Sequence, residues 1–144
     1  MRLKDYRFSF QKMLSFKGNT ASYMLYSYAR ISSIVRKLQI DRADIYNPER
    51  FNEVQITEEP ERVVLLLLVR LDQIILDTVQ DLLPHRLCDW MYQLATAYTD
   101  FYEKCRVIGV DGAPNWTRLV LCEATRQALR LCFQLLNLHE VERM

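Results

Sequence analysis

Residues 17–38, KGNTASYMLYSYARISSIVRKL, hold the pattern that decides the fold. Apolar residues recur there at steps of three and four, the spacing of one face of an α-helix. The members of this stripe are Met24, Tyr28, Ile31, Val35 and Leu38. Gly18 interrupts any preceding helix, and Asn19 or Thr20 can cap the next one. We therefore predict a helix that begins at this cap and runs to about Gln39.

The same stretch carries a second stripe, about a quarter turn away, in which rings and cations are mixed. Its members are Tyr23, Tyr26, Arg30, Ser33 and Lys37. Tyr26 and Arg30 are one turn apart, so a ring and a guanidinium share one patch. A ring that stacks on a base, beside a cation that meets phosphate, is what single-stranded RNA loops require. The pattern leaves a second interpretation equally open, in which the tyrosines rim the core and the arginines extend into solvent.

The rest of the chain is also helical in pattern, which predicts an all-α helical bundle. The expected further helices are 9–16, a helix capped by Thr57 that runs to about Arg70, 72–81 with Asp72 as its cap, one from Pro84 to about Lys104, and 115–138. The connector 40–57 is expected to be irregular with a turn at Asn47-Pro48, and 107–114, VIGVDGAP, to be a loop. A second apolar stripe should lie in the core; it comprises Leu87, Met91, Leu94, Tyr98 and Phe101.

Length and charge limit the function classes. The 144 residues fit one domain. The net charge is only +1, but residues 1–50 hold ten Lys and Arg against four acids, whereas residues 51–144 hold nine against fourteen. This asymmetry indicates that the basic half faces a polyanion, unless it is an accident of surface composition.

Several kinds of chemistry are not indicated. The sequence has no Gly-rich phosphate loop, nucleophile elbow or HExxH motif, so we predict neither a catalytic residue nor a metal site. The four cysteines form no CxxC pair, which is typical of reduced, buried thiols in a cytosolic protein. No segment reads as an export signal or a membrane span, so we expect a cytoplasmic protein without membrane contact.

Three ordered blocks resemble the anticodon-binding domain of arginyl-tRNA synthetase. The first is RLKDYRFSFQKMLSFKGNTASYMLYSYARISSIVRK, which is similar to the family's run of Met-Leu, Gly-Asn-Thr-Ala and Tyr-x-x-Ala-Arg-Ile. The second is LPHRLCDWMYQLATAYTDFYEKCRVIG, in which Trp90 replaces the usual tyrosine and Tyr98 the usual phenylalanine. The third is the end, RLVLCEATRQALRLCFQLLNLHEVERM. The resemblance covers almost the whole chain.

The resemblance implies a bundle of the DALR type, the anticodon-binding fold of class I synthetases, over residues 1–144. Such a domain is appended to a catalytic domain, which is absent from this sequence, as is the family's usual first helix of the bundle. The full-length enzyme would join arginine to its tRNA, using ATP and magnesium that this part does not itself hold. This part would grip the anticodon stem-loop of tRNA-Arg beside the rest of the synthetase, with multi-synthetase proteins as further possible partners.

The resemblance also places individual residues near RNA. Tyr26 and Arg30 match family positions close to the anticodon bases and agree with the mixed stripe. The family's last residue also approaches this pocket, which would make Met144 part of it. The predicted tRNA contacts are Tyr26, Arg30, Tyr23, Lys37, Trp90 and Met144, with Tyr102 and Lys104 as neighbours. For Trp90 a packing role is the alternative.

Two other functions stay open on the sequence alone. The acidic half and the near-neutral charge also suit a helical interaction module that docks onto protein and does not read RNA. Absence of the family's first helix could instead leave an apolar groove that drives dimerisation.

Overall fold

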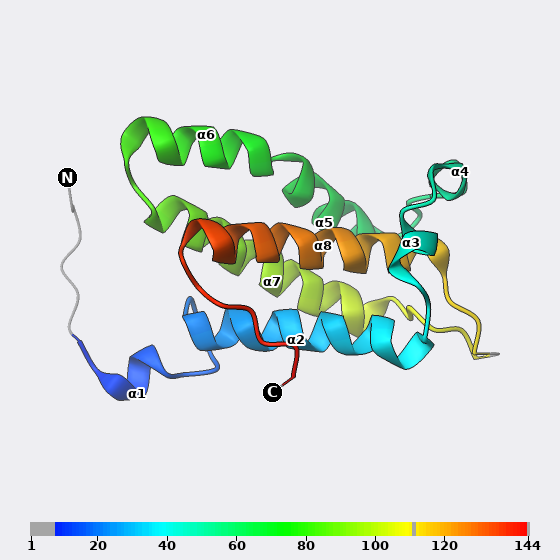
Figure 1. The fold of residues 1–144 in the computed structure, drawn as a ribbon, viewed down its shortest axis with the longest axis horizontal. Coiled ribbons are helices and arrows are strands. Elements are labelled where there is room, and N and C mark those ends of the chain that lie inside the picture. Colours follow the sequence, from blue (N-terminus) through cyan, green and yellow to red (C-terminus); the bar gives the residue numbers. More distant parts are fainter. Residues whose placement is uncertain (1–7, 111, 144) are drawn as a thin grey trace.

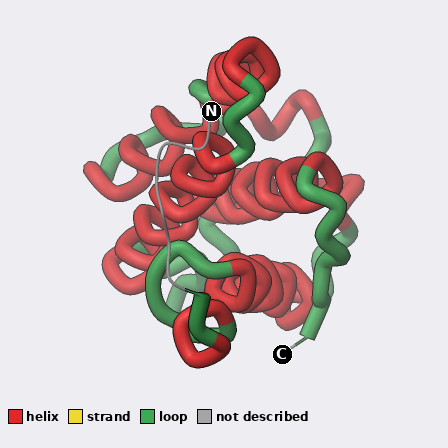
Figure 2. The backbone as a smooth tube through the Cα atoms, turned by 90° about the vertical axis from the view of Figure 1, so that its left-hand side faces the viewer, coloured by secondary structure: helices red, strands yellow, loops and turns green. Residues whose placement is uncertain are grey.

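Three long helices run along the length of the molecule: α2 (Ala21–Leu38), α7 (His85–Lys104) and α8 (Trp116–Leu135) (Figure 1). The structure is a computed structural model and describes residues 8–110 and 112–143. The view along the bundle shows the helices gathered around a common centre (Figure 2). Every regular element in these ranges is a helix, and the one further pairing is an isolated bridge between Ile108 and Pro114. The predicted all-α bundle is confirmed.

The shorter helices surround this body. α5 (Glu59–Val69) packs against α7 and α8, and α6 (Leu71–Asp81) follows it after a bend at Arg70. Three single-turn helices complete the order: α1 (Phe10–Met13), α3 (Arg42–Ile45) and α4 (Pro48–Phe51). α1 lies at one end of the bundle, whereas α3 and α4 lie at the other (Figure 1). None of the helices in the described ranges combines the length and the apolar character that crossing a membrane requires.

Local chemistry explains where α2 begins and ends. Gly18 adopts φ of 82°, a left-handed conformation that glycine tolerates without a steric penalty. Thr20 then caps the helix, because its Oγ1 accepts a hydrogen bond of 3.2 Å from the backbone N–H of Tyr23. Gln39 ends the helix in the left-handed conformation and Arg36 and Lys37 lie in its last turn, where cations suit the helix dipole.

Several predicted boundaries need correction. The cap of α5 is Glu58, not Thr57, because the Glu61 side chain reaches back to accept from both of these backbone N–H groups. Asp72 lies in the first turn of α6 and does not precede it. The connector 40–57 is more ordered than expected, since it contains α3 and α4. Helix α8 ends at Leu135, earlier than predicted.

Both predicted apolar stripes lie in the core. In α2, Tyr28 and Ile31 are fully buried, and Leu38 at the helix end is partly exposed. In α7 the stripe from Leu87 to Phe101 is buried throughout. Its members pack against α2, α5 and α8, so a single core joins all four helices.

Two ion pairs with buried carboxylates lie beside this core, one between α5 and α8 and one within α8. Glu61 in α5 and Arg118 in α8 approach to 2.7 Å, with Glu61 only 1% exposed. Glu123 and Arg126, both in α8, approach to 2.6 Å and are each 1% exposed. Charges in this setting require partners for every donor and acceptor, so the surrounding residues are constrained by hydrogen bonding as well as by shape.

Candidate functional site

A basic cavity of about 360 Å³ lies on the mixed stripe of α2. The residues that line it, which we call the arginine cavity, are Tyr26, Ala29, Arg30, Ser33, Arg36 and Arg143. Five of them come from successive turns of α2. Arg143 comes from the C-terminal segment, residues 136–143, which follows α8. Three arginines line it, and none of its lining residues is acidic. The cavity therefore favours a ligand that carries negative charge.

Tyr26 and Arg30 are both available in this cavity. The Tyr26 side chain is 44% exposed, and its ring forms a T-shaped contact with the Phe16 ring at a centroid distance of 6.2 Å. The Arg30 guanidinium lies 4.5 Å from the centre of the Tyr102 ring. This cation–π contact holds the stem of Arg30 against α7 and orients its charged end. One wall thus offers a ring for stacking and a positioned cation.

The C-terminal segment is fastened to the bundle at two points. Glu140 pairs with Arg130 of α8 at 3.0 Å. Glu142 accepts a hydrogen bond of 3.2 Å from the Tyr28 hydroxyl through Oε1, and its backbone carbonyl accepts one of 3.4 Å from Arg36. These contacts place the next residue, Arg143, over α2.

A buried network continues from Tyr28 into the core. The Tyr28 hydroxyl accepts a hydrogen bond of 2.9 Å from Arg126 Nη1, while Arg126 makes two further bonds to the Glu123 carboxylate. Tyr46 donates its hydroxyl hydrogen to the same carboxylate. The C-terminal segment is therefore connected, through one hydroxyl, to the buried ion pair of α8.

The pKa values of this network show which groups stay charged. Burial raises the pKa of Glu123, but hydrogen bonds from Arg126 and Tyr46 outweigh burial and leave the pKa below its usual value. Burial also raises the pKa of Tyr28, although the Arg126 charge opposes this. At neutral pH Glu123 and Arg126 are therefore both charged. The Tyr28 hydroxyl keeps its proton and can donate it to Glu142.

The other predicted contact residues lie outside the arginine cavity. Tyr23 is partly buried, with its ring edge on Tyr92 at 5.8 Å and its hydroxyl 3.5 Å from Thr99 Oγ1. Lys37 is exposed in the last turn of α2. Met144 lies outside the described residues.

Trp90 requires a correction. Its side chain is 3% exposed, and its Nε1–H donates a hydrogen bond of 3.1 Å to the backbone carbonyl of Leu67. No base can stack on a ring that the core covers, so packing replaces the predicted RNA contact. Of the two proposed neighbours, Tyr102 supports Arg30 from α7, whereas Lys104 pairs with Asp100 at 2.7 Å.

Arg36 and Arg143 line the arginine cavity but are not among the contacts predicted from the sequence. Arg36 follows the mixed stripe by position, three residues after Ser33, and could have been included on spacing alone. Arg143 had no such signal, because its approach to α2 depends on where the C-terminal segment folds back.

The cysteine side chains lie mostly in the core. The four cysteines are unpaired, and three of them are buried. Burial raises the pKa of Cys122 and of Cys132 to about 12, which keeps both thiols protonated and unreactive near neutral pH. Within the described ranges, no cluster of three or more His, Cys, Asp or Glu side chains is placed to hold a metal ion.

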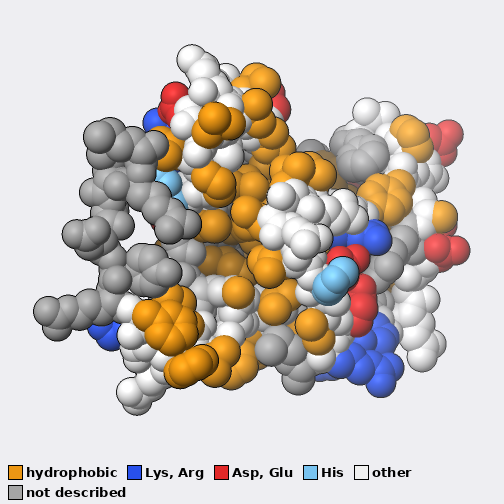
Figure 3. Space-filling view, turned by 60° about the vertical axis from the view of Figure 1, so that its left-hand side comes forward, with side chains coloured by type: hydrophobic (Ala, Val, Ile, Leu, Met, Phe, Trp, Pro, Cys, Tyr) orange, Lys and Arg blue, Asp and Glu red, His pale blue; other side chains and the backbone are white. Residues whose placement is uncertain are grey.

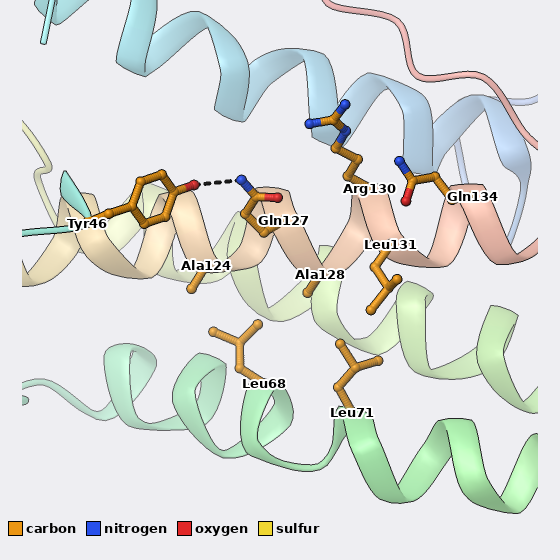
Figure 4. A pocket seen from close by; sticks show the side chains of 9 residues that line it. All are labelled: Tyr46, Leu68, Leu71, Ala124, Gln127, Ala128, Arg130, Leu131 and Gln134. Atoms are coloured by element: carbon orange, nitrogen blue, oxygen red, sulfur yellow. Dashed lines mark hydrogen bonds between the residues drawn. The ribbon is translucent and has the colours of Figure 1, made fainter. Parts of the chain in front are cut away.

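A second feature is an apolar groove between α5–α6 and α8, with a volume of about 750 Å³. Leu68 and Leu71 project from one side toward Ala128 and Leu131 on the other (Figure 4). Tyr46 and Gln127, joined by a hydrogen bond of 2.6 Å, also line it (Figure 4). Hydrophobic side chains also gather over the face where α6 stands away from the bundle (Figure 3). The exposed ones on α5 and α6 include Leu66, Val69, Leu76 and Val79.

The sequence of this chain is similar to a known domain family and to several named proteins. Residues 24–144 match the model of the DALR anticodon binding domain. The chain is 41% identical over 143 residues to an arginine–tRNA ligase of Nostoc punctiforme, covering 99% of this chain and 24% of that protein. It is 38% identical over 149 residues to the cytoplasmic arginine–tRNA ligase of Xenopus tropicalis, covering 99% and 23%. The chain thus spans about a quarter of the length of these relatives.

A solved structure gives the same result for the fold. Arginyl-tRNA synthetase from Plasmodium falciparum superposes with a TM-score of 0.85 at 36% sequence identity, over 99% of this chain and 24% of that one. The match extends through every helix described above, including the segment that carries the arginine cavity.

Proposed function

Because the chain belongs to the DALR anticodon-binding domain family, we propose that it binds the anticodon stem-loop of tRNA-Arg through the arginine cavity on α2. A base stacks on the exposed Tyr26 ring, and Arg30 meets the same nucleotide from the adjacent turn. Arg36 and Arg143 supply further positive charge, and Lys37 meets phosphate farther along the helix. The observation that carries this proposal is the meeting of three arginines and a half-exposed tyrosine in one cavity without an acid.

The reaction itself belongs to a longer protein. The relatives are named arginine–tRNA ligases, and we infer that residues 1–144 form the anticodon-binding part of such an enzyme. ATP and magnesium would act in the catalytic domain of the full-length ligase and are assigned no residue here. The role of the described chain is to hold the stem-loop, so that the tRNA is presented in a fixed orientation to the rest of the synthetase.

Substitutions in α2 test the proposal. We expect Tyr26→Ala and Arg30→Ala each to weaken binding to a transcribed tRNA-Arg anticodon stem-loop about tenfold or more, since a stacked base or a base-edge contact contributes about 1–3 kcal/mol. Affinity is measured by fluorescence anisotropy with the 144-residue chain at low and moderate salt, beside a loop with its middle base replaced. Circular dichroism confirms that each variant is folded.

The matched control is Arg62→Ala, which removes an exposed arginine of α5 that pairs with Glu59. This variant should bind like the unchanged chain. If Tyr26→Ala and Arg30→Ala also bind normally, the assignment of the site to α2 is wrong. Affinity should also fall with added salt, because cations that contact phosphate release counterions.

The apolar groove favours a second candidate function, docking of protein. The matched relatives are about four times as long as this chain, so the remainder of a ligase chain of that length is the occupant that we propose for the groove. Contiguous exposed apolar side chains on α5 and α6 are typical of a surface that another part of the protein covers.

Isolation of the chain should reveal this surface. We expect concentration-dependent self-association in sedimentation experiments, and a reduction of it in Leu131→Glu, which places a charge in the groove. Leu131 is 41% exposed, so the substitution can be made without opening the core. A monomer mass at every concentration for the unchanged chain would show that the groove does not drive association, and would remove this support for docking.

A further inference from the structure

A second cavity adjoins the arginine cavity on α2 and has a volume of about 440 Å³. Its walls include Ser32, Val35 and Arg36 from α2, and Glu142 from the C-terminal segment. Arg36 lines both cavities, and the consecutive residues Glu142 and Arg143 line one cavity each. The two cavities are therefore neighbours that share one arginine, Arg36.

Ser32 distinguishes this second cavity. Its side chain is 1% exposed, and its Oγ is the one buried side-chain N or O atom of the described residues that has no hydrogen-bond partner. The two other serines in this part of α2 are satisfied: Ser27 donates to the Tyr23 carbonyl at 3.0 Å and Ser33 to the Arg30 carbonyl at 2.7 Å. A buried hydroxyl without a partner destabilises the free protein, and a ligand with a polar edge can compensate for it.

The lining chemistry narrows the class of ligand. Asp41 and Glu142 add negative charge beside Arg36, which disfavours a free phosphate or another small anion. Val35 and Ile40 supply apolar surface, while Ser32 and Gln39 supply neutral donors and acceptors. A nucleobase has this combination, with apolar faces and a polar edge, and the volume lies in the range of small-ligand sites.

We propose that the second cavity takes the base adjacent to the one held in the arginine cavity, on the same RNA strand. Ser32 Oγ hydrogen-bonds to the edge of this second base, and Arg36 meets the phosphate that joins the two nucleotides. The inference rests on the proposed binding of an RNA loop to α2 and adds a second nucleotide subsite to it. Two successive bases are separated by one phosphate, which matches two cavities separated by one arginine.

Paired serine substitutions separate binding from folding. Ser32→Ala removes the unpartnered hydroxyl, so the midpoint of thermal unfolding should stay the same or rise, while affinity for the stem-loop should fall about tenfold. Ser27→Ala removes a satisfied buried hydroxyl on the same helix that lines neither cavity, so it should lower the midpoint and leave affinity unchanged. The opposite signs of the two effects exclude a purely structural explanation.

A cycle with modified RNA then locates the second base. Stem-loops that carry one abasic nucleotide at each loop position are titrated against the unchanged chain, Ser32→Ala and Arg30→Ala. At one loop position, removal of the base should weaken binding to the unchanged chain. Ser32→Ala should bind this abasic RNA as well as it binds the unmodified RNA, because the hydroxyl that contacts the base is already absent. The loop position at which removal of the base has no further effect on binding to Arg30→Ala should be the next nucleotide along the same strand.

The outcomes are distinguishable. If Arg30→Ala weakens binding but Ser32→Ala binds normally, the cavity holds water only, and the second subsite is overturned while the arginine cavity stands. Coupling of both variants to the same nucleotide would also overturn it. If the unchanged chain does not bind the stem-loop, or binds with no loss in Arg30→Ala, the proposed function fails, and the second subsite fails with it.

Discussion

Replacing Arg126 by methionine is expected to lower the free energy of unfolding by about 3–5 kcal/mol, because it leaves the Glu123 carboxylate buried without its cation. Methionine keeps most of the length of the side chain, so the loss reports on charge and hydrogen bonding more than on volume. Three hydrogen bonds disappear, two to Glu123 and one to the Tyr28 hydroxyl. Urea unfolding followed by circular dichroism measures the change.

Two further variants make this experiment specific. Arg130→Met removes an arginine of the same helix whose ion pair with Glu140 is partly exposed to solvent, and its effect on the unfolding midpoint should be small. In the double variant Glu123→Leu with Arg126→Met, both charges are gone, and stability should recover much of the loss. A double variant that is less stable than Arg126→Met alone would show that the unpaired carboxylate is not the cause.

The second large effect is expected for Glu61→Ala, at about 3 kcal/mol of lost stability. Glu61 is buried and its carboxylate acts at two places: Oε1 pairs with Arg118 at 2.7 Å, and Oε2 accepts from the Thr57 and Glu58 backbone N–H groups at 2.9 and 3.1 Å. Burial raises the pKa of this carboxyl, but the hydrogen bonds from Arg118 and the backbone outweigh it and leave the pKa below its usual value. Alanine removes an interhelical pair and a helix cap together.

Glu59→Ala is the matched control for Glu61→Ala. Glu59 lies two residues away in the first turn of α5, and its pair with Arg62 is exposed on both sides. Its removal should not shift the midpoint of urea unfolding measurably. Equal losses for Glu59→Ala and Glu61→Ala would mean that acidic charge near the helix N-terminus, rather than the buried pair, stabilises α5.

Periodicity predicted the helices well because each long helix buries one continuous stripe. Tyr28 and Ile31 recur at helical spacing, and both are fully buried. Local rules were less accurate at boundaries. Thr57 is a better cap by residue preference than Glu58, but the buried partner Arg118 fixes the position of Glu61, and Glu61 in turn fixes the start of the helix. A contact between distant elements therefore overrode a local preference.

The site could be predicted only in part, for a related reason. Tyr26 and Arg30 share a face of α2, and both line the arginine cavity, as their spacing indicated. Trp90 was a predicted contact by resemblance alone, and it is buried in the core, where its Nε1–H donates to the Leu67 carbonyl of α5. Ser32 and Arg143 line cavities that form only when the C-terminal segment lies against α2, and no local pattern encodes that approach.

The packing of α2 against α8 has a consequence for the order of events during synthesis. α2 is the first long helix of the chain to be made, and its main partner is the last. At about 5–20 residues per second, roughly 5–20 s pass between the two. During that interval α5 and α7 can pair, whereas the apolar stripe of α2 has no α8 to cover it. On the ribosome, α7 alone can pack against α2, and part of the apolar stripe of α2 stays uncovered until α8 is made.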